Sequence, residues 1–426
     1  MTIWTLQKGH DRRFRGGHPW VYSNELAASP KGIAPGDPVE LRGPGGEFLA
    51  WGYGHPGSLI AFRALGRNPL ETQPWSAAGV LSRLRGASAL RRQAGLGQAS
   101  HRLVFGEADA LPGLVVDRYR LTGGQQVLAV QAQTAGADRL LPALREALET
   151  LTGEETAMGG PSWEQTALVI RNDTRGRVME GLEEEPPRLE KALAGVDLTQ
   201  AELVLEDGST LTADLVGGQK TGFFLDQRAN VTRLAALVRS ALAIPAGAPG
   251  PLNVLDVFGY VGQWGAALAR TAKQGGATAR VTVMDSSASA LERAQANLTA
   301  AGAQAVPLKA DAMKALLELP AAAFQVVVAD PPAFIRSRKD QPTGQAAYAK
   351  LFAQALRLTA PGGLVAACSC SQLLSPEDFR EVLAKAESKS GRPVRWVAQG
   401  GQGPDHPVVA AFPEGNYLKC WLGVVG

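Results

Sequence analysis

Cysteine and histidine are scarce in this sequence. Its 426 residues include only three cysteines and five histidines. Three cysteines cannot build a disulfide framework, and the histidines show no spacing typical of metal ligands. We therefore expect neither a disulfide-stapled fold nor a metal site.

Long apolar runs are also missing. No uncharged apolar stretch reaches transmembrane length without a Pro or Gly interruption, and the opening MTIWTLQKGHDRRFRGGH lacks the apolar core of a secretory signal. Hydrophobic residues make up 45% of the chain and charged residues 19%, as in ordinary globular proteins of two or three domains. We expect a reduced, cytoplasmic protein.

Positive charge is unevenly distributed along the chain. Residues 1–100 carry 12 Lys and Arg against 6 Asp and Glu, whereas the remainder carries 31 against 34. A basic amino-terminal module beside a slightly acidic body is typical of nucleic-acid binding, although a solvated basic face explains the charge equally well. If the module binds RNA, Arg12, Arg13 and Arg15 are candidates for phosphate contacts.

The sequence pattern divides the chain into three parts. Residues 1–70 contain short alternating segments broken by tight turns, which predict a small β-barrel. Residues 71–195 contain a linker and an α+β unit, and residues 196–426 form the third domain. From about residue 217, continuous apolar strands alternate with amphipathic helices, which predicts an α/β, doubly wound, mostly parallel sheet with its ligand at the carboxyl ends of the strands.

Aspartates end three successive strands of this third domain. Asp256, Asp285 and Asp311 occupy these positions, where carboxylates accept hydrogen bonds from ribose hydroxyls. Any one of them has the alternative role of a helix N-cap, but the set favours a nucleoside-containing cofactor.

The turn after the first strand selects between two such cofactors. Gly259 and Gly262 permit a sharp turn and close approach of a ligand. Phe258 and Tyr260, however, are bulky where a dinucleotide-binding turn has glycine to approach a pyrophosphate. S-adenosylmethionine carries no phosphate, so the turn favours a methyltransferase over a dehydrogenase.

The stretch VVVADPPAF ends the fourth strand in a rigid corner. Pro331 and Pro332 remove two amide donors after Asp330, which leaves a corner rich in acceptors. Such a corner suits a planar base, with Phe334 as a stacking face. The alternative is a turn that merely ends a strand.

Cys368 and Cys370 follow the next apolar run, in ACSCSQ. Methylation of a pyrimidine at carbon 5 requires a thiolate that adds to carbon 6, and Cys370 is the candidate because it lies nearer the strand end between two serines. Cys368 continues the apolar run and is expected to be buried, and Cys420 is expected to be structural.

In order and spacing these motifs resemble the RlmI-type bacterial 23S ribosomal RNA 5-methylcytosine methyltransferase family. The resemblance runs nearly end to end and includes KGHDRRFRGGHPWVYSNEL, FGEADALPGLVVDRY, GQKTGFFLDQRAN, DVFGYVGQWG, DPPAF, CSCS and DHPVVAAFPEGNYLK. It implies an amino-terminal PUA domain, a central α+β domain and a Rossmann-like class I methyltransferase domain.

The resemblance also implies roles for individual residues. Cys370 is the covalent nucleophile and Asp330 marks the site of methyl transfer. The group that removes the carbon 5 proton is left undetermined. S-adenosylmethionine is implied to bind a larger set of residues: Phe224, Asp226, Arg228, Asp256, Phe258, Gly259, Tyr260, Gly262, Asp285, Ser286, Asp311, Ala312 and Asp330.

The resemblance implies that the partner is large-subunit ribosomal RNA, naked or in an early assembly intermediate. It also implies a homodimer, which no stretch of the sequence establishes.

Two rival hypotheses remain for the function. One is a guanine-nitrogen methyltransferase of ribosomal RNA that uses DPPAF without a covalent adduct. The other is a non-catalytic RNA-binding assembly factor that keeps its cofactor site.

Overall fold

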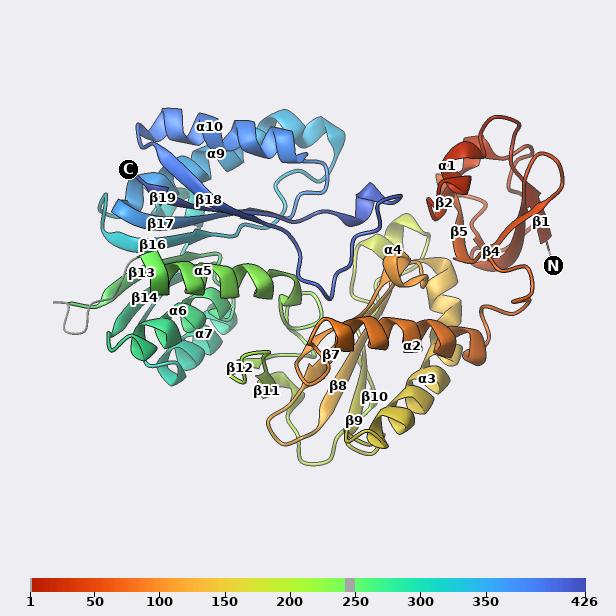
Figure 1. Ribbon diagram of the computed structural model, residues 1–426, viewed down its shortest axis with the longest axis horizontal. Helices are drawn as coiled ribbons and strands as arrows, with labels where there is room; N and C mark the ends of the chain where they lie inside the picture. The colour runs from red at the N-terminus through yellow and green to blue at the C-terminus, as the bar shows by residue number, and fades with distance from the viewer. Residues whose placement is uncertain (1, 242–249) are drawn as a thin grey trace. The chain divides into compact units, whose positions relative to one another are not determined.

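The computed structural model describes residues 2–241 and 250–426. The chain divides into two compact units (Figure 1). The first extends to Leu225 and includes Pro404–Gly415, and the second comprises Asp226–Gly403 and Asn416–Gly426. Within the described ranges, no helix is both long and apolar enough to cross a bilayer.

Short strands and a one-turn helix form the amino-terminal part of the first unit. They are β1 Thr2–Thr5, α1 Arg12–Arg15, β2 Trp20–Tyr22, β3 Asp37–Arg42, β4 Phe48–Gly54 and β5 Ile60–Gly66. The strands make one sheet in the order β1-β3-β4-β5-β2. Phe14, Val39, Leu41 and Phe62 are buried in its core. The predicted module of short strands and tight turns is confirmed.

A second sheet with two long helices follows in the same unit. Its elements are α2 Ala77–Gln93, β6 His101–Phe105, β7 Leu114–Arg120, β8 Gln126–Ala132, α3 Ala135–Thr156, β9 Thr166–Ile170, α4 Gly176–Met179 and β10 Arg188–Lys191. The strand order is β10-β9-β8-β7-β6. Helices α2 and α3 pack on this sheet (Figure 1) around a core that includes Leu84, Val116 and Leu144.

A two-stranded hairpin, β11 Ala201–Val204 and β12 Thr210–Ala213, ends the main segment of the first unit. The sequence pattern assigned residues 196–225 to the third domain, whereas the structure groups them with the first unit. The division into three domains stays a prediction.

The second unit is built on a seven-stranded sheet. Its elements are α5 Arg228–Ala241, β13 Leu252–Val257, α6 Gln263–Gln274, β14 Ala279–Asp285, α7 Ala288–Ala300, β15 Ala303–Lys309, α8 Ala312–Ala315, β16 Phe324–Ala329, α9 Gln341–Leu358, β17 Thr359–Ser369, α10 Pro376–Ser390, β18 Val394–Gly400 and β19 Lys419–Val425. The strand order is β15-β14-β13-β16-β17-β19-β18, and the first five run parallel. The predicted doubly wound α/β domain is confirmed.

Helices cover both faces of this sheet, with α9 and α10 on one side and α5, α6 and α7 on the other (Figure 1). Strand order reverses between β13 and β16, because the chain first builds outward through β14 and β15 and then returns to the other side of β13. In open α/β sheets this reversal leaves a crevice at the carboxyl ends of the strands.

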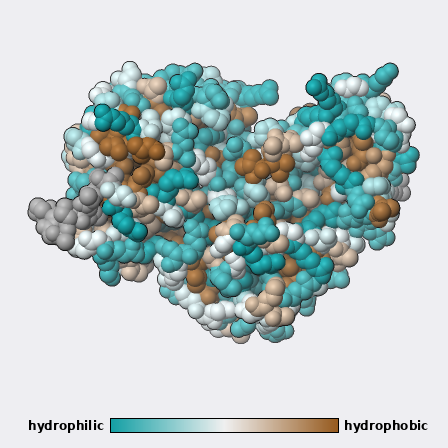
Figure 2. Space-filling view, viewed as in Figure 1, coloured by the Kyte–Doolittle hydropathy of each residue, from teal (hydrophilic) through white to brown (hydrophobic). Residues whose placement is uncertain are grey.

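The surface in Figure 2 is largely hydrophilic or intermediate, with hydrophobic residues in small separate patches. Individual exposed side chains such as Leu59 and Leu70 are ordinary on a folded surface.

Candidate active site

Three aspartates gather at the carboxyl edge of the second sheet. Asp256 lies near the end of β13, Asp285 ends β14, and Asp330 directly follows β16. Because the three strands are parallel neighbours, their carboxyl ends meet at one edge. Asp330 and Asp285 both act on the carboxyl of Asp256 electrostatically, so the structure brings the three carboxylates together.

Asp256 is the most deeply placed of the three. It is fully buried, and burial is the main reason that its pKa rises to about 7. The amide of Gly265 donates to its Oδ2 at 3.0 Å and opposes the rise, whereas Asp330 and Asp285 add to it. Its Oδ1 has no hydrogen-bond partner among the described residues. A buried acceptor in a cluster of carboxylates fits a cationic or hydrogen-bond-donating ligand.

The turn after β13 is strained at two bulky residues. Phe258 and Tyr260 adopt the left-handed region, with φ of 63° and 47°, a conformation that costs non-glycine residues roughly 1–2 kcal/mol each. A Cβ on Gly259 would lie 2.5 Å from Val283 Cγ2 and 3.0 Å from Asp256 Cγ, so only glycine fits between the two strands. Gly262 is the N-cap of α6, with φ of 78°.

Backbone amides orient the carboxylate of Asp285. Tyr260 N donates to Oδ2 at 3.1 Å and Ser287 N donates to Oδ1 at 2.9 Å, which ties the ends of β13 and β14 together. A carboxylate has further lone pairs, so these bonds leave acceptor capacity for ribose hydroxyls. Ser286, also predicted to bind the cofactor, is exposed beside it.

Asp311 serves as a helix cap. Its side chain accepts from Met313 N at 2.9 Å at the start of α8, and it is exposed, while the neighbouring Ala312 is buried. The N-cap alternative therefore describes its local geometry, and contact with the adenine edge stays a prediction.

Two residues that the motif analysis did not single out hold the carboxylate of Asp330. Gln227 Nε2 donates to Oδ1 at 2.8 Å, and Trp264 Nε1 donates to Oδ2 at 3.2 Å. Asn230 fixes the Gln227 amide by donating to its Oε1 at 2.8 Å. Asp330 is thus held as an oriented acceptor. Gln227 lies inside the quoted KTGFFLDQR segment, so its position could have indicated the role.

The other three residues of that segment predicted to bind the cofactor belong to different units of the structure. Asp226 is buried and accepts from Tyr417 Oη at 2.6 Å, and Arg228 is buried at the start of α5. Phe224 belongs to the first unit, where Lys220 Nζ lies 4.3 Å from the centre of its ring. Their contact with a cofactor stays a prediction.

Aromatic side chains surround the DPP corner. The ring of Phe334 lies 4.7 Å from that of Tyr348 and 6.5 Å from that of Phe258, measured between ring centres. Phe258 and Phe334 are half-buried, whereas Tyr348 belongs to the core. Pro331 is buried and Pro332 exposed. The partly open rings suit stacking on a base.

Cys370 lies against the DPP corner. Its Sγ is 3.9 Å from the carbonyl oxygen of Pro331, and it is half-buried because β17 ends one residue earlier. Cys368 is fully buried opposite Cys420 on β19, and burial raises the pKa of the Cys368 thiol. The described structure therefore offers one accessible thiol at this edge and keeps the other two inert.

Lys419 was not predicted as a site residue. It begins β19 opposite Ser369, and its Nζ donates to the carbonyl oxygens of Ser371 and Tyr417 at 2.6 and 2.8 Å. Burial lowers its pKa to about 8, while Cys370 acts to raise it. An ammonium group close to a thiol favours the thiolate. Lys419 lies in the quoted NYLK motif but 49 positions beyond Cys370, so only strand pairing shows that the two are neighbours.

The first unit holds the three arginines predicted to contact phosphates. Arg13 pairs with Glu25 at 2.9 Å, and Arg15 pairs with Asp11 and Glu47. Arg12 is exposed and has no ion pair within the described part of the chain. Arg12 is therefore the one of the three whose charge is not neutralised locally.

Two domain families match this chain. Residues 5–67 match a PUA-like domain, and residues 254–363 match a methyltransferase domain. In overall fold the chain is similar to a protein described as a SAM-dependent methyltransferase from Streptococcus mutans, with a TM-score of 0.74, 16% identity and full coverage of both chains. A methyltransferase structure complexed with SAH gives the same TM-score at 17% identity, also with full coverage.

Curated relatives extend the similarity over nearly the whole sequence. Ribosomal RNA large subunit methyltransferase I of Cronobacter sakazakii is 31% identical over 424 residues, and that of Photobacterium profundum is 32% identical over 423 residues. Each alignment covers 97% of both chains. Since relatives 31% and 32% identical cover nearly the whole chain, the chain belongs to the ribosomal RNA large subunit methyltransferase I family.

Proposed function

We propose that this protein transfers a methyl group from S-adenosylmethionine to carbon 5 of a cytosine in large-subunit ribosomal RNA, through a covalent bond between Cys370 and carbon 6. The observation that carries the proposal is the accessible Cys370 thiol, 3.9 Å from the Pro331 carbonyl oxygen in the DPP corner. A methyltransferase acting on a guanine nitrogen has no use for a thiol there.

The carboxylate cluster supports the choice of cofactor. S-adenosylmethionine carries a positive sulfonium and an ammonium group, and Asp256, Asp285 and Asp330 offer three carboxylates at the edge where they would bind. The buried Oδ1 of Asp256, which has no partner among the described residues, suits the ammonium group. Asp285 suits the ribose hydroxyls. When bound, the cofactor supplies a methyl group to the activated ring carbon.

The protein's part in the reaction is to make carbon 5 of cytosine nucleophilic. The Cys370 thiolate adds to carbon 6, and the electron pair of the ring double bond moves toward carbon 5. After methylation, loss of the carbon 5 proton restores the double bond and expels the thiolate. Lys419 stabilises the thiolate before addition and after release. The Asp330 carboxylate accepts a hydrogen bond from the cytosine amino group and orients the ring.

The product of the reaction tests this function directly. Full-length protein is incubated with labelled S-adenosylmethionine and ribosomal RNA that lacks the modification, and the nucleosides are resolved by mass. We expect 5-methylcytidine in a single large-subunit fragment. Methylated guanosine would favour the rival methylation of a guanine nitrogen. If no label is transferred to the RNA although the protein still binds the cofactor, the result would favour an assembly factor.

RNA binding by the PUA-like module predicts unequal effects of substitutions at Arg12 and Arg13. Arg12→Ala should weaken RNA affinity by about threefold to tenfold and reduce the salt dependence by about one charge, with unchanged stability. Arg13→Ala should instead lower the melting temperature, because Arg13 bonds Glu25 and the Trp20 carbonyl. RNA titrations at several salt concentrations and thermal melts measure the two effects. Equal RNA affinity in wild type and Arg12→Ala would contradict the assignment.

A further inference from the structure

Two arginines are buried on one face of β7. Arg118 and Arg120 are two residues apart, so both side chains lie on the same side of the strand, and they are only 2% and 8% exposed. Leu114 and Val116 precede them on this face and belong to the core under α2 and α3. Two like charges at the end of an apolar core are costly unless negative charge balances them.

A single carboxylate, that of Glu155, acts on both arginines and balances only one of the two charges. Arg118 Nη2 lies 2.8 Å from Glu155 Oε2, whereas Arg120 has only neutral hydrogen-bond partners, with Nη1 donating to Gln126 Oε1 at 2.9 Å and Nη2 to the Gly97 carbonyl at 3.4 Å. The Nε groups of both arginines are buried without a hydrogen-bond partner in the described parts of the chain. Burial, and then repulsion by Arg118, lower the pKa of Arg120 to about 10.

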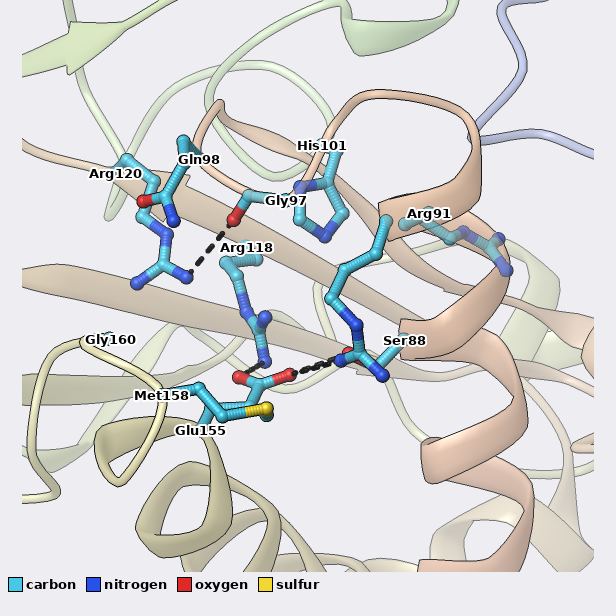
Figure 3. Close-up of a pocket in the computed structure, with 11 residues that line it drawn as sticks. Ser88, Arg91, Gly97, Gln98, His101, Arg118, Arg120, Glu155, Met158 and Gly160 are labelled. Atoms are coloured by element: carbon cyan, nitrogen blue, oxygen red, sulfur yellow. Dashed lines mark hydrogen bonds and ion pairs between the residues drawn. The ribbon is translucent and has the colours of Figure 1, made fainter.

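A cavity opens beside these side chains (Figure 3). Its volume is about 80 Å³, several times the roughly 10–15 Å³ that one water needs. Figure 3 shows Arg118 pointing from the strand toward Glu155 and Arg120 pointing toward the carbonyl of Gly97, both at the border of the cavity. The residues that line it are Ser88, Arg91, Arg92, Gly97, Gln98, His101, Arg118, Arg120, Glu155, Met158 and Gly160.

The lining is strongly cationic. Arg91 is neutralised by a two-bond pair with Asp109. Glu155 is the one acidic residue among the described lining residues, and it already accepts from Ser88 Oγ at 2.5 Å. Its single negative charge is outnumbered by the three positive charges of Arg92, Arg118 and Arg120. A small cavity with an excess of guanidinium groups and unsatisfied donors is suited to a tetrahedral oxyanion.

We propose that this cavity binds a phosphate group, either from an RNA backbone or from a free phosphorylated small molecule. Arg118 and Arg120 provide the buried donors, and Arg92 provides a charge at the rim, since its side chain is 46% exposed. The site lies within the first unit and does not depend on methyl transfer, so its failure would leave the proposed reaction untouched.

Titration calorimetry of the full chain with inorganic phosphate, at ionic strength matched with chloride, tests the proposal. We expect saturable binding that Arg120→Gln weakens by about tenfold or more. Arg85→Gln is the matched control, because Arg85 lies on α2, as the cavity residue Arg92 does, but is exposed and pairs with Glu154 outside the cavity. Phosphate binding no stronger than chloride binding, or equal loss in Arg85→Gln and Arg120→Gln, would overturn the proposal.

Thermal melts establish that the variants fold. If Arg120→Gln does not fold, Arg92→Gln replaces it, with an expected weakening of about threefold to tenfold, and wild-type affinity in this variant would count against the site. Competition with a ribosomal RNA fragment then identifies the source of the phosphate. Displacement of RNA by phosphate in wild type but not in Arg120→Gln indicates the backbone, and RNA binding unaffected by saturating phosphate indicates a small molecule.

Discussion

Cys370→Ser is expected to lose methyl transfer by at least about 10³-fold, which corresponds to about 4 kcal/mol of transition-state stabilisation. An alcohol is a far weaker nucleophile than a thiolate near neutral pH, so carbon 6 is not attacked and carbon 5 stays unreactive. The fold and cofactor affinity should be unchanged, because Cys370 is only half-buried and serine is close to cysteine in size and shape. Transfer of label to RNA measures the loss, and cofactor titration checks binding.

Two further measurements separate a nucleophile from a bystander. RNA with 5-fluorocytidine at the target position should trap a covalent adduct with wild type and none with Cys370→Ser, because fluorine at carbon 5 cannot leave as a proton does. Cys368→Ala is the matched control: it removes a buried thiol two residues away, so it should lower stability and keep the activity of the folded protein. Full activity in Cys370→Ser would eliminate the thiol mechanism.

Lys419→Met is expected to lower methyl transfer by roughly 10- to 100-fold at pH 7, by removing a cation that interacts electrostatically with Cys370. Since burial brings the pKa of Lys419 to about 8, its ammonium is present below that pH and is lost as the pH rises through it. Support for the thiolate is therefore available near neutrality and fades above pH 8. Some loss of stability is also expected, because the Ser371 and Tyr417 carbonyls lose their donor.

The pH dependence of alkylation separates the electrostatic role from a structural one. Cys368 and Cys420 are fully buried, so iodoacetamide reports on Cys370. Thiolate formation in Lys419→Met should shift to higher pH. Lys419→Arg retains a cation and should match the wild-type profile below pH 8. Above pH 8, where Lys419 loses its charge, the variant should keep the support for the thiolate that wild type loses. The role of Lys419 fails if Lys419→Met and wild type are alkylated with the same pH profile.

Local sequence patterns predicted much of this architecture. Apolar strands alternating with amphipathic helices predicted the doubly wound sheet, and aspartates at strand ends predicted a set of Asp256, Asp285 and Asp311. The structure brings Asp256 and Asp285 together with Asp330 instead, whereas Asp311 caps α8. Both inferences depend on residues close in sequence and on the rule that parallel strands end at one edge. The pairing of Cys370 with the DPP corner followed from the same rule and is present in the structure.

These local patterns could not predict which strands and side chains pair across long distances in the sequence. Strand β18 was not predicted, because its residues alternate between exposed and half-buried and lack an apolar run. Lys419 reaches Cys370 only because β19 enters antiparallel between β17 and β18. At Arg13 and Arg15 the missing information was which acidic residues the fold places opposite them.

The late position of β19 has a consequence during synthesis. β19 lies between β17 and β18 but is translated after both, so the edge of β17 lacks its neighbour until residues 419–425 leave the ribosome. An apolar strand with an open edge can pair with other chains and aggregate. We expect nascent chains arrested before residue 419 to bind chaperones strongly and to lack the reactive thiol environment, which forms when the last strand enters the sheet.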